Sequence, residues 1–176
     1  VMSLKGKILN TWEVDTDAVT QSQEVKDIAM ALGLEPGCRT LENLRYGKIC
    51  ILADADTDGA HIATLICALF LKHFRPLVEA GHVFIAQPPL FRIDQGKEVF
   101  YALDEDEKEK IVKQLNSKNK QKKIEIQRFK GLGEMNPSQL RETVMKPESR
   151  RLVQLTLSSS DNANSVFDLL LSKKRA

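Results

Sequence analysis

A short apolar segment that ends in alternating carboxylates constrains the fold of this chain more than any other feature. Residues 49–53 are all apolar, and Asp54, Asp56 and Asp58 follow them before a glycine. Such a run predicts a strand buried on both faces, as in a parallel sheet. Residues 61–72 then have apolar side chains at helical spacing. The pattern predicts an α/β fold with the carboxylates at the carboxyl end of a strand, where open α/β sheets bind ligands.

The acidic turn, residues 54–59, has the composition of a magnesium site. Three carboxylates within five residues repel one another unless water or a cation screens them. Mg²⁺ takes one or two protein carboxylates and completes its shell with water and phosphate oxygens. We therefore interpret Asp54, Asp56 and Asp58 as candidate ligands of a magnesium ion that meets a phosphate.

Other interpretations of the acidic turn compete with this one. An EF-hand loop is excluded, because its twelfth position is Leu65 instead of Glu and a strand precedes the turn. A phosphotransferase of the haloacid dehalogenase type also has Asp-x-Asp after a strand, although Asp58 stands where that family has Thr or Val. A Toprim domain has Asp-x-Asp after a strand and binds Mg²⁺ for chemistry on nucleic-acid phosphates. The simplest alternative is a solvated turn in which Asp58 caps the next helix.

The composition indicates a soluble protein with reduced cysteines. Of the 176 residues, 42% are hydrophobic, and no apolar run approaches the roughly 20 residues that a membrane helix needs. We therefore expect no membrane contact and a cytoplasmic location. The three cysteines lack metal-ligand spacing, and Cys50 and Cys67 are expected in the core because they lie in apolar segments.

Charge is divided unequally along the chain. Residues 1–106 contain 10 Lys/Arg and 16 Asp/Glu, a net charge of −6, whereas residues 107–176 contain 16 and 8, a net charge of +8. An acidic half with a metal site and a basic half are typical of an enzyme that acts on DNA or RNA. The alternative for four of the lysines is a solvated linker; these are Lys118, Lys120, Lys122 and Lys123.

Apolar periodicity, caps and turn residues predict alternating strands and helices. Strands are expected at residues 4–10, 48–53, 82–86, 90–94, 97–102, 124–129 and 151–157. Helices are expected at residues 22–32, 60–80, 104–115, 137–145 and 165–172. Pro76 should kink the long second helix or begin a new one, because it has no N–H group. Alternation of strand and helix in the first half favours a parallel α/β sheet.

Four motifs resemble the Toprim part of type IIA DNA topoisomerases. They are Lys5-Gly-Lys-Ile-Leu-Asn10, Ala53-Asp-Ala-Asp-Thr-Asp-Gly-Ala-His-Ile62, Ile85-Ala-Gln-Pro-Pro-Leu90 and Arg128-Phe-Lys-Gly-Leu-Gly-Glu-Met-Asn-Pro137. Their order and spacing also agree, so the resemblance covers nearly the whole chain. Residues 10–14 and 92–102 are most similar to the B subunit of bacterial topoisomerase IV, and the related gyrase B subunit is the alternative.

The resemblance implies a function in ATP-dependent passage of one DNA duplex through a double-strand break in another, with decatenation and relaxation. A tyrosine of the A subunit would attack the DNA phosphate. The expected partners are double-stranded DNA and the topoisomerase IV A subunit, in an A2B2 assembly. Mg²⁺ is the expected cofactor, and ATP would bind only to an ATPase domain that is absent from this sequence.

The resemblance also assigns roles to individual residues. Asp54, Asp56 and Asp58 would be the Mg²⁺ ligands, and Lys7 and Asp54 would act in catalysis. The expected DNA-binding residues are Lys5, Lys7, Asn10, His61, Arg128 and Lys130. Backbone N–H groups of the turn at residues 131–133 are expected to face a phosphate. For His61, at the start of a helix, capping or packing is an equal alternative.

One departure from the family concerns the metal site. Family members also use a Glu from a Glu-Gly-Asp-Ser motif on the first Toprim strand, and this sequence has no such motif. We therefore expect an inactive fragment of a longer subunit, with weak Mg²⁺ binding. The implied fold is a Toprim-type parallel sheet flanked by helices, lacking its first strand, at residues 1–103, followed by a basic α+β tail region at residues 104–176.

An alternative function is a docking module for the A subunit and DNA without a catalytic role. The helix expected near the C-terminus would supply the contact through an apolar face. That face consists of Val166, Phe167, Leu169 and Leu170.

Overall fold

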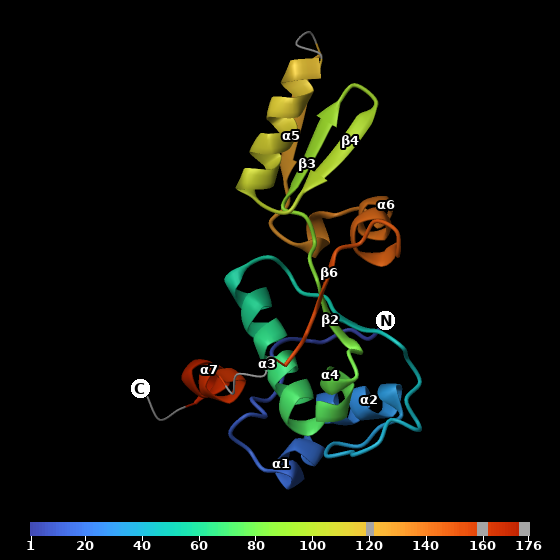
Figure 1. Cartoon of the computed structure of the whole chain (residues 1–176), viewed down its shortest axis with the longest axis vertical. Coiled ribbons are helices and arrows are strands. Elements are labelled where there is room, and N and C mark those ends of the chain that lie inside the picture. The colour runs from blue at the N-terminus through green and yellow to red at the C-terminus, as the bar shows by residue number, and fades with distance from the viewer. Residues whose placement is uncertain (119–121, 158–161, 173–176) are drawn as a thin grey trace. The chain divides into compact units, whose positions relative to one another are not determined.

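The computed structural model describes residues 1–118, 122–157 and 162–172 and has mixed α/β structure (Figure 1). It divides into two compact units, each built from separate chain segments. The first unit consists of Val1–Ile51, His61–Ile85 and Val153–Ala176, and the second of Leu52–Ala60 and Ala86–Leu152. The mixed α/β class expected from the sequence is confirmed.

A small sheet belongs largely to the first unit. Its strands are β1 (Ile49–Ile51), β2 (Val83–Ala86) and β6 (Leu152–Gln154), in the order β1-β2-β6. β1 and β2 are parallel and pair Ile49 with Val83, as the sequence predicted. β6 runs antiparallel to β2, because Gln87 N–H donates to the Arg151 carbonyl while Leu155 N–H donates to the Val83 carbonyl.

The helices of the first unit begin and end at residues with clear local signals. They are α1 (Thr16–Gln21), α2 (Gln23–Leu32), α3 (Thr57–His73, which begins in the second unit), α4 (Arg75–Glu79) and α7 (Asn162–Leu171). α2 buries Val25 and Leu32 and ends at Gly33, which has a φ of 76°. Pro76 lies in the first turn of α4, where its missing N–H needs no partner, so the expected break before it is confirmed.

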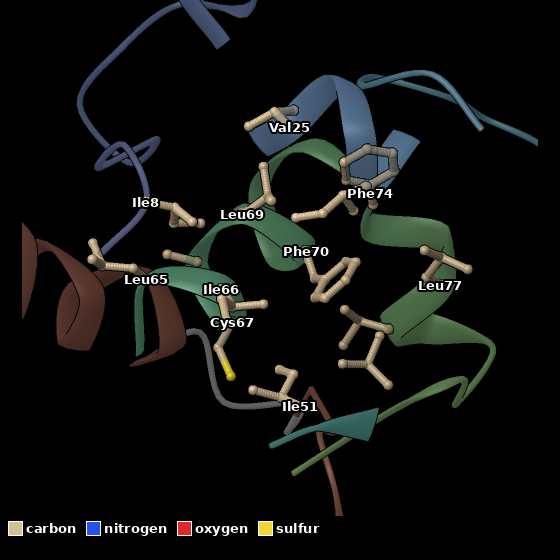
Figure 2. Packing of buried hydrophobic residues seen from close by; sticks show 14 of the residues in the cluster. Ile8, Val25, Ile51, Leu65, Ile66, Cys67, Leu69, Phe70, Phe74 and Leu77 are labelled. Atoms are coloured by element: carbon tan, nitrogen blue, oxygen red, sulfur yellow. The ribbon is translucent and has the colours of Figure 1, made fainter. Parts of the chain in front are cut away.

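The core of the first unit gathers around α3 (Figure 2). Leu69 and Phe74 of the α3–α4 segment are completely buried. They contact a cluster that includes Val25 of α2, Ile51 of β1 and Ile8 of the N-terminal segment. A fully buried aliphatic or aromatic side chain contributes about 1.5–3 kcal/mol relative to an exposed one. The cluster therefore fixes three otherwise separate pieces of chain to one helix.

The second unit contains an antiparallel sheet covered by one helix (Figure 1). Its elements are β3 (Phe91–Gln95), β4 (Glu98–Ala102), β5 (Ile124–Arg128) and α5 (Glu105–Lys118), and the strand order is β4-β3-β5. Gly96, with a φ of 68°, makes a hairpin turn between β3 and β4, which correspond to the strands expected at residues 90–94 and 97–102. Phe91, Ile93 and Leu115 form part of a small core between sheet and helix.

A short helical segment follows β5 in the same unit. It contains a 3₁₀ turn η1 (Leu132–Glu134), α6 (Pro137–Leu140) and a π-helical turn η2 (Arg141–Met145). Asn136 caps α6: its side chain accepts from Gln139 N–H, and the Gln139 side chain accepts from Asn136 N–H. The predicted helix start at Asn136 is confirmed, and the helix changes to π geometry for its second half.

Several strand predictions are wrong in extent. Residues 4–10 form no strand, and β6 covers only part of the expected 151–157. β1 is three residues long and is not buried on both faces, because Cys50 is exposed. The prediction of Cys50 in the core is therefore wrong. Cys67 is buried as expected, and burial raises the pKa of its thiol to about 11.

The helices differ from expectation at their ends. α1 was not predicted, although Asp15 caps it by accepting from Ala18 N–H. α3 begins three residues earlier than expected, at Thr57. Part of the Lys-rich stretch expected as a linker lies outside the described residues, whereas Lys118 ends α5. Over the described ranges, no helix has the length and apolar character needed to cross a membrane.

Candidate metal and DNA site

The acidic turn contacts a second motif of the chain through Asp54. Its Oδ1 accepts a hydrogen bond from the backbone N–H of Leu132 at 2.8 Å, across 78 residues of sequence. Both residues belong to the second unit. The Gly-Leu-Gly turn was expected to direct its N–H groups at a phosphate, but the Leu132 N–H is directed at a protein carboxylate.

Asp56 fixes the start of α3. Its Oδ1 accepts from Gly59 N–H at 2.7 Å, and its carbonyl accepts from Ala60 N–H at 3.0 Å. This is the geometry of a helix N-cap, and a carboxylate there also interacts favourably with the helix dipole. The cap is therefore Asp56, and the interpretation of Asp58 as the cap is wrong; Asp58 lies within the first turn.

Two glycines allow this part of the chain to pack closely around Asp54. A Cβ at Gly59 would lie 2.1 Å from the carbonyl oxygen of Asp54, a distance that only a backbone shift can relieve. A Cβ at Gly131 would lie 3.0 Å from Asp54 Oδ1. At Gly133 a Cβ would have no atom within 4 Å. Gly59 is thus required by close approach. At Gly131 a side chain would press on the Asp54 carboxylate, and Gly133 has room for a side chain.

The carboxylates of the acidic turn are not assembled into a three-ligand centre. No group of three His, Cys, Asp or Glu side chains able to hold a metal occurs in the described part of the chain. Asp54, Asp56 and Asp58 are all exposed, and their oxygens are hard donors of the kind that Mg²⁺ prefers. A carboxylate has about four lone-pair sites, so the backbone hydrogen bond of Asp54 or Asp56 leaves capacity for a cation. The donor set therefore fits Mg²⁺.

At the end of β5, two basic residues flank a buried phenylalanine. Phe129 is 1% exposed, and its N–H donates to the Leu90 carbonyl at 2.8 Å. Arg128 and Lys130 flank it and are exposed, since successive side chains of an extended segment point in opposite directions. The Lys130 N–H donates to Glu134 Oε2 at 2.8 Å, which braces the turn that meets Asp54.

The N-terminal motif lies in the first unit. Lys5 and Lys7 are exposed, whereas the adjoining Ile8 is buried in the core. The Asn10 amide makes two hydrogen bonds within the protein: Nδ2 donates to the Leu171 carbonyl at 2.8 Å, and Oδ1 accepts from Trp12 N–H at 3.1 Å. Asn10 therefore has a structural role, and its DNA contact stays a prediction.

The predicted site residues are thus shared between the two units. The second unit brings Asp54 to the turn that follows Arg128 and Lys130. The first unit contains Lys5, Lys7, Asn10 and also His61, which is exposed in the first half of α3. Sequence reasoning missed the partnership of Asp54 with Leu132. Gly59 and Gly131 were the available signal, because each lies close to Asp54.

Comparison with protein families decides between the interpretations of the acidic turn. A model of the Toprim domain matches residues 1–88, which is half of the chain. The chain belongs to the Toprim family. A second model, described as the carboxyl terminus of the DNA gyrase B subunit, matches residues 121–176.

Individual relatives agree with the family matches. The chain is 63% identical over 176 residues to the B subunit of DNA topoisomerase 4 from Pseudomonas aeruginosa, and 62% identical over 178 residues to that from Escherichia coli (strain K12). It is 44% identical over 172 residues to the B subunit of DNA gyrase from Thermotoga maritima. The topoisomerase 4 matches cover 100% of this chain and 28% of each relative. The resemblance stated from the motifs, closer to topoisomerase IV than to gyrase, is confirmed.

Proposed function

We propose that this chain is the Mg²⁺-binding part of the DNA cleavage–religation centre of a bacterial type IIA topoisomerase, most like topoisomerase IV. The hydrogen bond from Leu132 N–H to Asp54 carries the proposal. It joins the acidic turn to the turn that follows Arg128 and Lys130 within one unit. Carboxylates that can hold a metal ion are therefore connected to basic side chains that can hold a phosphate. The sequence identity to the topoisomerase 4 B subunit supports the reaction class.

In this proposal Asp54, Asp56 and Asp58 hold Mg²⁺. The bound ion supplies Lewis-acid stabilisation of negative charge on phosphate oxygens. Asp54 and Asp56 each use Oδ1 to fix the turn, which keeps both carboxylates in place before a cation arrives. A site that is ordered in advance lowers the entropy lost on binding.

The basic side chains have separate tasks. Arg128 and Lys130 hold the DNA backbone, and the buried Phe129 between them fixes their spacing. Lys5, Asn10 and His61 contact the backbone from the first unit. Lys7 acts as a catalytic residue together with Asp54, because a fixed positive charge stabilises the negative charge that develops in the transition state.

The proposal extends to the assembly in which the chain acts. Its partners are double-stranded DNA and the A subunit, whose tyrosine attacks the DNA phosphate, in a cytoplasmic A2B2 complex. ATP acts through a domain outside this chain. Within the chain, residues 1–103 serve as the Toprim core and residues 104–176 as the basic tail region, in keeping with the order of the two family matches.

Replacing Asp56 by Asn in the complete subunit tests the proposal. Asn also caps helices, so the start of α3 should persist while one negative charge is lost. Asp104→Asn is the matched control, because Asp104 Oδ1 caps α5 by accepting from Glu107 N–H at 2.8 Å. With the A subunit present, Asp56→Asn should abolish Mg²⁺-dependent DNA cleavage, and Asp104→Asn should leave it unchanged. Normal relaxation of supercoiled DNA by Asp56→Asn would refute the metal assignment.

A docking role is the second candidate, and exposure on α7 favours it. Val166, Leu169 and Leu170 are 49%, 60% and 60% exposed, whereas Phe167 packs on Trp12. Leu169→Glu should then weaken co-sedimentation of the complete protein with the A subunit. If Asp54→Asn and Asp56→Asn had no effect on cleavage while Leu169→Glu prevented assembly, docking would replace catalysis as the function.

A further inference from the structure

The segment that precedes α1 is ordered without secondary structure of its own. Residues 1–15 form neither helix nor strand, yet Ile8 is 5% exposed and Thr11 is fully buried. Figure 2 shows Ile8 directed into the cluster around α3. Buried backbone polar groups need partners, and a segment outside any sheet or helix obtains them from other parts of the chain or from water.

The end of α3 supplies the first set of partners. The His73 imidazole lies with Nε2 3.1 Å from the Thr11 carbonyl, to which it donates as the Nε2–H tautomer. The Lys72 ammonium donates to the carbonyls of Trp12, at 2.5 Å, and Val14, at 3.1 Å. Two consecutive side chains of one helix thus hold the carbonyls of residues 11, 12 and 14.

The helix α7 supplies the second set. Trp12 Nε1–H donates to Asp168 Oδ1 at 2.7 Å, a short bond to a charged acceptor. The Trp12 ring lies 5.1 Å from the Phe167 ring, centroid to centroid. One turn further on, the Leu171 carbonyl accepts from Asn10 Nδ2 at 2.8 Å. The same unit contains both segments, so the contacts belong to one compact body.

We propose that Trp12 and Asp168 are positioning residues, and that α7 acts as a latch that holds Lys5 and Lys7 in place for DNA. The inference rests on the proposed role of Lys7. Lys7 is exposed and joined directly to Ile8, so the anchored stretch 8–14 fixes the backbone from which its side chain extends. Without the latch, the enzyme would have to order this stretch each time it placed the Lys7 ammonium against a phosphate.

Asp168→Ala in the complete protein, assembled with the A subunit, tests the latch. Ala removes the acceptor for the Trp12 indole, whereas Asp168→Asn keeps an oxygen in the same place. Asn164→Ala, an exposed change on the same helix, is the control. Hydrogen exchange of the Trp12 amide, which donates to Asn10 Oδ1, should become about tenfold faster in Asp168→Ala, because the opening loses one hydrogen bond to a charged group. Asp168→Asn and Asn164→Ala should exchange as the parent does.

The consequence for Lys7 is measured by a double-mutant cycle. Asp168→Ala should slow DNA cleavage roughly tenfold with little change in DNA affinity, and Asp168→Asn should restore the rate. In the Lys7→Ala background, Asp168→Ala should have little further effect, since residues that act as a unit are not additive. Additive losses, or faster exchange spread equally over the amides of α3, would overturn the latch in favour of general stabilisation.

The two parts of the hypothesis fail in different ways. If Lys7→Ala cleaved DNA at the parent rate, the proposed role of Lys7 would be refuted, and with it the purpose of the latch. Unchanged exchange of the Trp12 amide in Asp168→Ala would refute the latch itself while leaving the role of Lys7 intact.

Discussion

The acidic turn of the second unit and the N-terminal segment of the first unit are ordered in opposite ways. In the acidic turn, the candidate ligands Asp54 and Asp56 themselves make the hydrogen bonds that fix the chain. In the N-terminal segment, Lys5 and Lys7 are exposed, and their neighbours make the anchoring contacts. In the acidic turn, the candidate metal ligands therefore also stabilise the structure. In the N-terminal segment, the candidate DNA-binding residues and the residues that stabilise the structure are different ones.

This difference decides how substitutions should be interpreted. A change at Asp54 or Asp56 alters both a charge and a structural bond, so only substitutions that preserve the bond report on the charge. A change at Lys7 removes an exposed charge from a segment that its buried neighbours anchor.

The largest effect is expected for Gly59→Ala, because the acidic turn is packed against its own helix. The new Cβ would meet the carbonyl oxygen of Asp54 at 2.1 Å, and only a backbone shift can relieve that contact. Overpacking costs about 1–3 kcal/mol, which exceeds the gain from replacing glycine within a helix. Urea unfolding should show a lower midpoint. Gly133→Ala, with no atom within 4 Å of its Cβ, should leave stability unchanged or slightly raised. Equal stability of both variants would contradict the packing.

A smaller effect is expected when the bond between Asp54 and Leu132 is removed. Asp54→Ala leaves the Leu132 N–H without its acceptor, which costs about 1 kcal/mol at this exposed position. Asp54→Asn retains an oxygen and should cost less than about half of that. Chemical denaturation of the two variants measures the difference. If the two variants were equally destabilised, Asp54 would stabilise the turn through its charge and not through its hydrogen bond to Leu132. The proposed double role of Asp54 as metal ligand and structural acceptor would then be wrong.

Lowering the pH should loosen the scaffold of the N-terminal segment through His73. Burial lowers the pKa of this imidazole below its ordinary value of 6.5; the bond to Thr11 raises it, and the nearby Lys72 charge lowers it. Because the folded-state pKa is the lower one, the unfolded chain binds the proton first as the pH falls below about 6.5. Stability is therefore full above that pH and decreases below it until the folded-state pKa is reached.

Thermal unfolding at pH 7.5 and 5.5 measures this loss of stability. We expect the loss to be modest, because it occurs only between the unfolded-state and the folded-state pKa of His73. His73→Gln should reduce it, since Gln keeps a donor for Thr11 and does not titrate. The pKa values of Glu24 and Glu107 are also lowered, chiefly by hydrogen bonds, but their stabilisation begins to be lost only below about 4.5. An undiminished pH dependence in His73→Gln would assign the effect to other groups.

The sequence predicted those parts of the fold that local chemistry decides. Gly96 made the hairpin, Pro76 divided the long helix, and Asn136 began α6. Each signal lies within a few residues of the structure that it specifies. The strand predicted at residues 4–10 failed because this part of the chain has distant partners: Asn10 Nδ2 donates to the Leu171 carbonyl, 161 residues away. No local pattern encodes such a partner.

The candidate site was predictable to a similar degree. The motifs identified Asp54 and the Gly-Leu-Gly turn separately, but not that Asp54 accepts from Leu132 N–H. The alternative interpretation of the turn named Asp58 as the cap instead of Asp56, because either carboxylate precedes an apolar helical pattern. Only the position at which α3 begins distinguishes them. That start depends on how the turn closes on itself, with Gly59 N–H bound to Asp56 Oδ1 and Gly59 close to the Asp54 backbone.

The smallest effect on stability, and the sharpest test of the comparison, is expected for Lys7→Ala. Lys7 is exposed, and substitution of an exposed side chain usually changes the free energy of unfolding by less than about 0.5 kcal/mol, so a value close to that of the parent is expected. In the assembled enzyme, the same change should reduce the slope of log affinity for DNA against log salt by roughly 1. Lys122→Ala combined with Lys123→Ala is the control, because those lysines lie in the Lys-rich stretch. If the control flattened the salt dependence and Lys7→Ala did not, the DNA contact would belong to that stretch. A destabilised Lys7→Ala variant would show that Lys7, like Asp54, is part of its own scaffold.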